Sequence, residues 1–103
     1  MSFKRVYISG PMTGVDDFNR TAFRSAAERL QAAGYAPICP ADIVGADNWE
    51  WSDWMREALR WMLMADAVAL LPGWRESRGA MVEFTLCAEL DIPCEPIECF
   101  FES

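Results

Sequence analysis

The residue of this sequence best suited to chemistry is Glu83, an acid in the middle of the mostly apolar segment 80–90. The side chains one helical turn before and after it are small or apolar, so none can pair with a carboxylate. Gly79 lies four residues earlier and shares its helix face, which leaves space above the carboxylate for a ligand. The alternative is an ordinary solvent-facing glutamate, and the pattern alone favours this alternative because lone helical glutamates are mostly exposed.

Two further stretches offer polar groups next to apolar ones. Asp66 opens the apolar run 66–72, where it either marks the end of a preceding helix or places a carboxylate at the mouth of a sheet. The stretch "YISGPMTG" (7–14) offers backbone N–H groups to an anion, as a glycine-containing loop before a helix can. A tight turn explains this loop equally well, because it contains neither a Walker nor a GxGxxG pattern.

The role of the five tryptophans has two possible interpretations. A tryptophan in a loop can stack on a planar ring such as a nucleobase, or it can cover a dimer surface. Three of the five lie in predicted loops, and the sequence does not separate the two readings. The tryptophans are Trp49, Trp51, Trp54, Trp61 and Trp74.

Composition excludes several classes of protein. There is no histidine, which excludes Ser-His-Asp and Cys-His nucleophiles. The net charge is −7 and the nine basic residues are scattered, which argues against binding of polymeric nucleic acid. The four cysteines form no CxxC pair, so we expect no metal site. Without a signal peptide or an apolar run of about 20 residues we expect a soluble, cytoplasmic protein that neither enters nor binds a membrane.

The order of predicted elements is βαβαβαβ within one domain, residues 1–103. The strands are predicted at 4–9, 35–39, 66–72 and 92–100. The helices are predicted from Asp16 or Asp17 to Gly34, from Ser52 to Ala65, and over 80–90, with Ser77 able to cap the last. This alternation predicts an α/β fold, a small doubly wound parallel sheet with helices on both faces. Ligands of such folds bind outside the carboxyl ends of the strands, which selects Ser9–Gly14, the loop after the second strand, and Gly73–Gly79.

Three stretches in series resemble the nucleoside 2-deoxyribosyltransferase superfamily: "VYISGPMTG", "MADAVALLPG" and "SRGAMVEFTLCAEL". This superfamily includes deoxynucleoside 5′-monophosphate N-glycosidases and short, often phage-encoded members. The resemblance implies a flavodoxin- or Rossmann-like fold, no cofactor, and cleavage of an N-glycosidic bond. It implies that Glu83 is the nucleophile, that Asp66 orients or protonates the substrate, and that Tyr7 lies near the nucleophile.

The resemblance also implies a site for a 5′-phosphate, formed by Ser9, Gly10, Gly14 and Ser77. The monophosphate hydrolases carry an arginine in the first loop, where this sequence has Met12. Either Arg75 or Arg78 replaces that contact or the substrate carries no 5′-phosphate. Trp74 and Gly79 complete the predicted binding residues.

We therefore expect hydrolysis or deoxyribosyl transfer on a small deoxynucleoside or its 5′-monophosphate. One alternative is a non-catalytic nucleotide-binding protein of the same fold. Another is an interaction module that uses the loop from Trp49 to Trp51. The superfamily also implies a homodimer or larger homo-oligomer whose neighbouring subunits help to close the sites.

Overall fold

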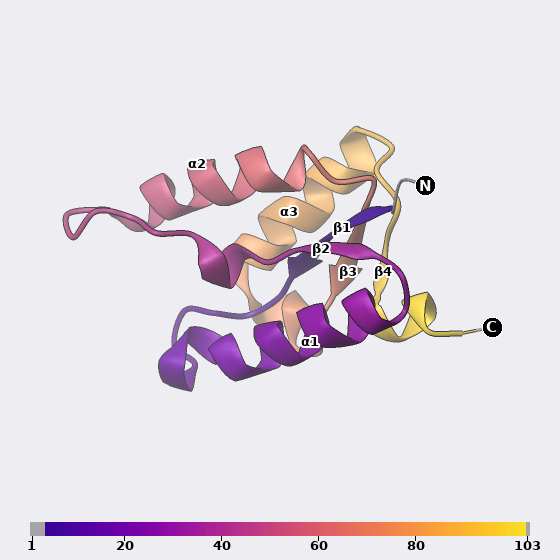
Figure 1. Cartoon of the computed structure of the whole chain (residues 1–103). Coiled ribbons are helices and arrows are strands. Elements are labelled where there is room, and N and C mark those ends of the chain that lie inside the picture. The colour runs from indigo at the N-terminus through magenta and orange to yellow at the C-terminus, as the bar shows by residue number, and fades with distance from the viewer. Residues whose placement is uncertain (1–3, 103) are drawn as a thin grey trace.

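The computed structural model describes residues 4–102, which form a four-stranded sheet with three α-helices (Figure 1). The strands are β1 (Arg5–Ser9), β2 (Ala36–Ile38), β3 (Ala67–Leu70) and β4 (Cys94–Pro96). The helices are α1 (Arg20–Ala32), α2 (Trp51–Met62) and α3 (Arg78–Glu89). All strand pairs are parallel and the order is β2-β1-β3-β4, so the predicted α/β fold class is confirmed.

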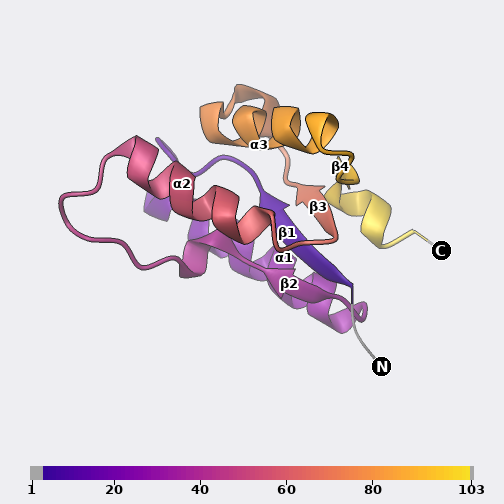
Figure 2. The ribbon, with the colours of Figure 1, turned by 90° about the horizontal axis from the view of Figure 1, so that it is seen from above.

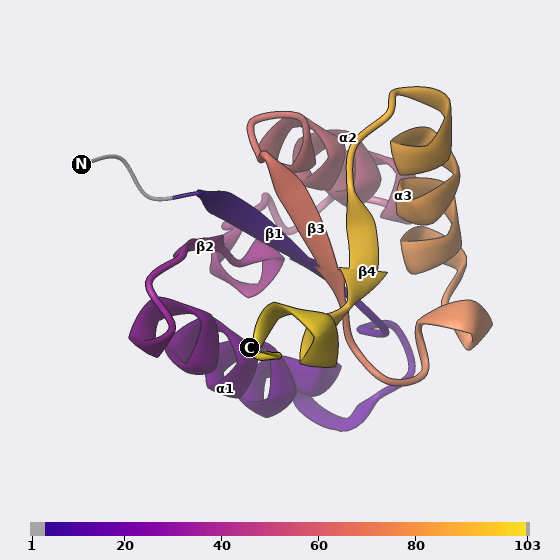
Figure 3. The same cartoon turned by 90° about the vertical axis from the view of Figure 1, so that its right-hand side faces the viewer.

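The sheet separates two layers of helix (Figures 2 and 3). Helix α1 covers one face, and α2 and α3 lie side by side on the other. Side chains alternate between the two faces along a strand. In β1, Val6 and Ile8 belong to the core beneath α1, whereas Tyr7 belongs to the core beneath α2 and α3. The same alternation directs Ser9 toward α3.

Several element boundaries differ from the predictions. Helix α1 begins at Arg20 rather than at Asp16 or Asp17, because Asp17, Phe18 and Asn19 all have left-handed backbone angles. The last strand ends at Pro96 and gives way to a 3-10 turn over Ile97–Phe100. Ile97 is buried in the α1 layer, so this turn helps to close that face of the sheet.

Helix α3 begins at Arg78, two residues before the predicted start at residue 80. The hydroxyl oxygen of Ser77 accepts a hydrogen bond from the backbone N–H of Ala80 at 3.2 Å, which confirms Ser77 as the N-cap. Within residues 4–102 no helix combines the length and the apolar character that crossing a lipid bilayer requires.

Candidate active site

Glu83 is buried, with 5% of its surface exposed, and both of its carboxylate oxygens accept hydrogen bonds. Tyr7 Oη donates to Oε2 at 2.5 Å, and Ser9 Oγ donates to Oε1 at 2.7 Å. Both donors lie on β1. They reach the same carboxylate because residues two apart on a strand point to the same face of the sheet. The solvent-facing position that the pattern alone favoured for Glu83 is therefore wrong.

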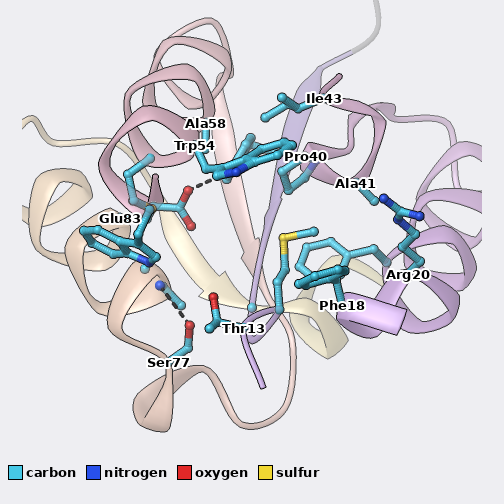
Figure 4. A pocket seen from close by; sticks show the side chains of 18 residues that line it. Thr13, Phe18, Arg20, Pro40, Ala41, Ile43, Trp54, Ala58, Ser77 and Glu83 are labelled. Carbon is cyan, nitrogen blue, oxygen red and sulfur yellow. Dashed lines mark hydrogen bonds between the residues drawn. The ribbon is translucent and has the colours of Figure 1, made fainter. Parts of the chain in front are cut away.

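The carboxylate of Glu83 borders a cavity of about 250 Å³ at the carboxyl ends of the strands (Figure 4). The loop after β1, the segments before α1 and after β2, and the first turns of α2 and α3 enclose it. The lining side chains are mostly apolar or aromatic. They include Phe18, Phe23, Ile43, Trp51, Trp54 and Met55. A cavity of this kind, with few convergent polar groups, is typical of a small-molecule site.

Burial governs the ionisation of the two central groups. Burial raises the pKa of Glu83 to about 7, although the hydrogen bonds from Tyr7 and Ser9 oppose that rise. Burial and the nearby Glu83 raise the pKa of Tyr7 well above its ordinary value. Tyr7 therefore keeps its proton and serves as a donor. Each oxygen of Glu83 retains a further lone pair that can face a ligand.

Two glycines at the cavity allow close approach between elements. A Cβ on Gly10 would lie 2.8 Å from the Cβ of Leu71, so Gly10 lets the loop after β1 pass close to the chain after β3. A Cβ on Gly79 would lie 3.1 Å from the sulfur of Met55 on α2. The space predicted above Gly79 is therefore partly filled by Met55, although Gly79 still lines the cavity.

Asp66 does not line the cavity that Glu83 borders. It precedes β3 at the edge where the parallel strands begin, whereas the cavity lies beyond the carboxyl ends of the strands. Its carboxylate accepts a hydrogen bond from the backbone N–H of Arg5 at 2.8 Å and lies 3.4 Å from the Arg5 side chain. These Arg5 hydrogen bonds lower the pKa of Asp66. The prediction that Asp66 contacts the substrate in this cavity needs correction, because a strand-leading residue lies at the wrong edge.

Several other predicted binding residues lie elsewhere. Ser9 is buried beneath Glu83 and bonded to it, so its hydroxyl is not presented to a ligand. Gly14 and the 3-10 turn carrying Trp74 and Arg75 are not part of the cavity lining. Arg75 lies over the ring of Trp74, with 5.0 Å between the guanidinium carbon and the ring centroid. The structure thus places these residues outside the cavity lining, and their roles in ligand binding stay predictions.

Arg78 stacks on an aromatic ring at the start of α2 instead of reaching into the cavity. Its guanidinium carbon lies 3.8 Å from the ring centroid of Trp51. Among the predicted residues, the cavity lining brings together Tyr7, Gly10, Met12, Ser77, Gly79 and Glu83.

Arg20 is a charged residue of the cavity that was not among the predicted site residues. It lines the side opposite Glu83, next to Phe18, and its side chain is half-exposed (Figure 4). Its guanidinium lies 3.9 Å from the Asp17 carboxylate, a long contact. The only sequence signal was its position at a helix start near the first loop. Trp51 and Trp54, whose role was left open, also line the cavity.

The fold is shared with two enzymes of known structure. One is described as the 2-deoxyribosyltransferase of Bacillus psychrosaccharolyticus, with 13% sequence identity and a TM-score of 0.68. That match covers 87% of this chain and 69% of the enzyme. The other is described as the 2-deoxyribosyltransferase of Leishmania mexicana, with 16% identity and a TM-score of 0.69. That match covers 88% of this chain and 61% of the enzyme. The expected resemblance is therefore confirmed at the level of the fold.

A family model described as "Domain of unknown function (DUF4406)" matches residues 4–94. The chain belongs to this family. A search of curated proteins found no match.

Proposed function

We propose that this protein cleaves the N-glycosidic bond of a deoxynucleoside or deoxynucleoside 5′-monophosphate, with Glu83 as the nucleophile. The observation that carries the proposal is a buried carboxylate, held by two hydroxyl donors, at the wall of an apolar cavity. Two enzymes that share the fold are described as 2-deoxyribosyltransferases, which supports the reaction class.

The chemistry follows from the position of the carboxylate. A glycosidic bond breaks through a transition state with positive charge on the sugar, and a carboxylate can stabilise that charge or attack the anomeric carbon C1′. Tyr7 and Ser9 hold the carboxylate in one orientation, so it does not have to be ordered during the reaction. Water then hydrolyses the glycosyl ester, or a second base accepts the sugar.

A 5′-phosphate has two candidate partners in the cavity. One is Arg20, the single cation among the lining residues within residues 4–102. The other is the N-terminus of α3, where backbone N–H groups near Gly79 have no partner within the helix. Arg20 then takes the place of the charge that is missing at Met12.

The test compares the wild-type protein with Glu83→Gln on a panel of deoxynucleosides and their 5′-monophosphates. Free base is separated by chromatography, with and without a second base as acceptor, which distinguishes hydrolysis from transfer. Glu89→Gln is the matched control, because Glu89 lies on the same helix but is exposed. We expect base release to be lost in Glu83→Gln and retained in Glu89→Gln. Equal base release by the wild-type protein and Glu83→Gln would show that Glu83 is not the nucleophile.

A second candidate function is nucleotide binding without turnover. The observation that favours it is the cavity's single carboxylate within residues 4–102, with Asp66 at the opposite edge of the sheet. Calorimetry against the same panel separates the two functions. Heat of binding without any free base supports the binding protein and contradicts the enzyme.

We also propose a homo-oligomer. Exposed apolar side chains lie on α2, on α3 and in the segments that follow these helices: Trp54, Leu63, Met64, Met81 and Leu90. A second copy of the chain would remove them from water. Light scattering during size exclusion measures the mass directly, and a mass of one chain would contradict this proposal.

A further inference from the structure

The cavity contains few groups that can exchange a proton. Within residues 4–102 its lining includes one carboxylate, Glu83, and one cation, Arg20. The guanidinium of arginine does not release its proton in proteins. Tyr7 is a weaker acid than an ordinary tyrosine because it is buried beside Glu83. The remaining hydroxyls, on Thr13 and Ser77, are weaker acids still.

A neutral base needs a proton that this lining does not supply. When Glu83 attacks C1′, the C1′–N bond breaks and its electron pair moves to the base nitrogen. A neutral nucleobase then becomes an anion that must be protonated, and such help is worth about 10²- to 10⁴-fold in rate. Glu83 cannot be the donor in that step, because the attacking carboxylate is ionised. Asp66, paired with Arg5 at the other edge of the sheet, is out of reach.

A base that is already cationic needs no proton. The same electron pair then neutralises the positive charge on the ring, and the base leaves as a neutral molecule. Glu83 carries the sugar as an ester. A water molecule attacks C1′, the ester bond breaks to regenerate the carboxylate, and the proton of the water passes to solvent.

The aromatic walls suit a flat cation. Trp51, Trp54 and Phe18 line the cavity, and the faces of such rings attract cations. One of them already binds a cation in this structure, since the guanidinium of Arg78 stacks on Trp51. The carboxylate of Glu83 faces the same space and adds a negative charge (Figure 4). Arg20, the like charge, lies on the opposite side and is half-exposed.

We infer that the preferred substrates of this cavity are N-glycosides whose base is cationic before cleavage, such as an N-alkylated pyridinium or an N7-alkylated purine. This inference rests on the proposed function and narrows its substrate class.

The experiment uses two matched pairs that differ in the charge of the base. The first pair is deoxyguanosine 5′-monophosphate and its N7-methyl derivative. The second is the 2′-deoxyribose form of nicotinamide mononucleotide and its neutral dihydro derivative. Base release is measured for the wild-type protein and Glu83→Gln, and the spontaneous rate without protein is subtracted. Thermal unfolding of the variant shows that it is folded.

We expect the cationic member of each pair to be cleaved with a kcat/KM at least about 100-fold higher, in a reaction that requires Glu83. Release of guanine at least as fast as that of N7-methylguanine overturns this inference and leaves the proposed function standing. If neither pair is cleaved faster by the wild-type protein than by Glu83→Gln, this inference fails. The proposed function fails with it only if the panel of deoxynucleosides and 5′-monophosphates also gives no base release that depends on Glu83.

Discussion

Tyr7 Oη lies 2.5 Å from Glu83 Oε2, although the two residues are 76 positions apart in the sequence. Tyr7 sits at the centre of the sheet, where β1 pairs with both β2 and β3, so its position is set by two neighbouring strands. Ser9, on the same face of β1, holds the other carboxylate oxygen. The carboxylate of Glu83 is therefore fixed at both oxygens at the wall of an apolar cavity.

The activity of the protein should rise with pH around neutrality. The nucleophile must be ionised, and the pKa of Glu83 is raised to about 7. We therefore expect kcat/KM, measured with a substrate that does not titrate there, to increase with a midpoint near pH 7. A decrease over the same range would instead identify protonated Glu83 as the active form and contradict a nucleophilic role.

Removing either hydroxyl donor should move that midpoint upward. The hydrogen bonds from Tyr7 and Ser9 lower the pKa of Glu83, so their loss in Tyr7→Phe or Ser9→Ala raises it. A hydrogen bond to a charged group is worth about 1.5–3 kcal/mol, which corresponds to about one pH unit or more. Tyr35→Phe is the control, because Tyr35 donates to the backbone of Phe100 and does not line the cavity. An unchanged midpoint in all three variants would show that the donors do not set the ionisation of Glu83.

Glu83→Gln should stabilise the protein at alkaline pH. The folded-state pKa of Glu83, about 7, lies above the ordinary glutamate value of 4.5, so the folded protein binds this proton more tightly than the unfolded chain. Stability is therefore lost as pH rises from about 4.5 through 7, by about 3 kcal/mol in total.

The measurement is the melting temperature of wild type, Glu83→Gln and Glu89→Gln at pH 5 and pH 8. The gain of Glu83→Gln over wild type should be larger at pH 8 than at pH 5. Glu89→Gln should show no such difference because Glu89 is exposed. A gain that is equal at both pH values would contradict a buried, titrating Glu83.

Arg20→Ala should weaken binding of phosphorylated substrates selectively. Loss of one charge-assisted contact is expected to raise KM for a 5′-monophosphate about tenfold and to leave the unphosphorylated nucleoside unaffected. Arg24→Ala is the control, because Arg24 lies one turn further along α1, is exposed and does not line the cavity. Equal changes for both substrates would mean that Arg20 does not contact phosphate.

Asp66→Asn should leave kcat and KM unchanged. Asp66 forms a hydrogen bond and an ion pair with Arg5 at the edge of the sheet away from the cavity, so its carboxylate does not contact a substrate bound there. The variant should lose the ion pair, and its melting temperature should fall slightly and more so above the lowered pKa of Asp66 than below it. A large loss of kcat in a variant that is still folded would show that Asp66 takes part in catalysis.

The sequence by itself determined the architecture. Alternating strand and helix patterns of this size leave few arrangements other than a parallel sheet covered on both faces, and the structure has that arrangement. Local signals were also reliable where the interaction is local, as with Ser77, which caps the helix that begins at the next residue. Glu83 stood out because an unpaired acid in an apolar helix conflicts with its surroundings.

Only the tertiary structure decided what surrounds Glu83. Its burial depends on Tyr7 and Ser9, which reach it through the pleat of β1 and the packing of α3 on the sheet. The role of Asp66 came from the resemblance alone, and it conflicts with the predicted strand direction, which places a residue that opens a parallel strand at the edge away from the ligand. Arg20 was missed because three residues with left-handed backbone angles turn the chain before α1, and no local pattern indicated them. Contacts between residues far apart in the chain are set by sheet order and helix packing, which a single sequence does not display.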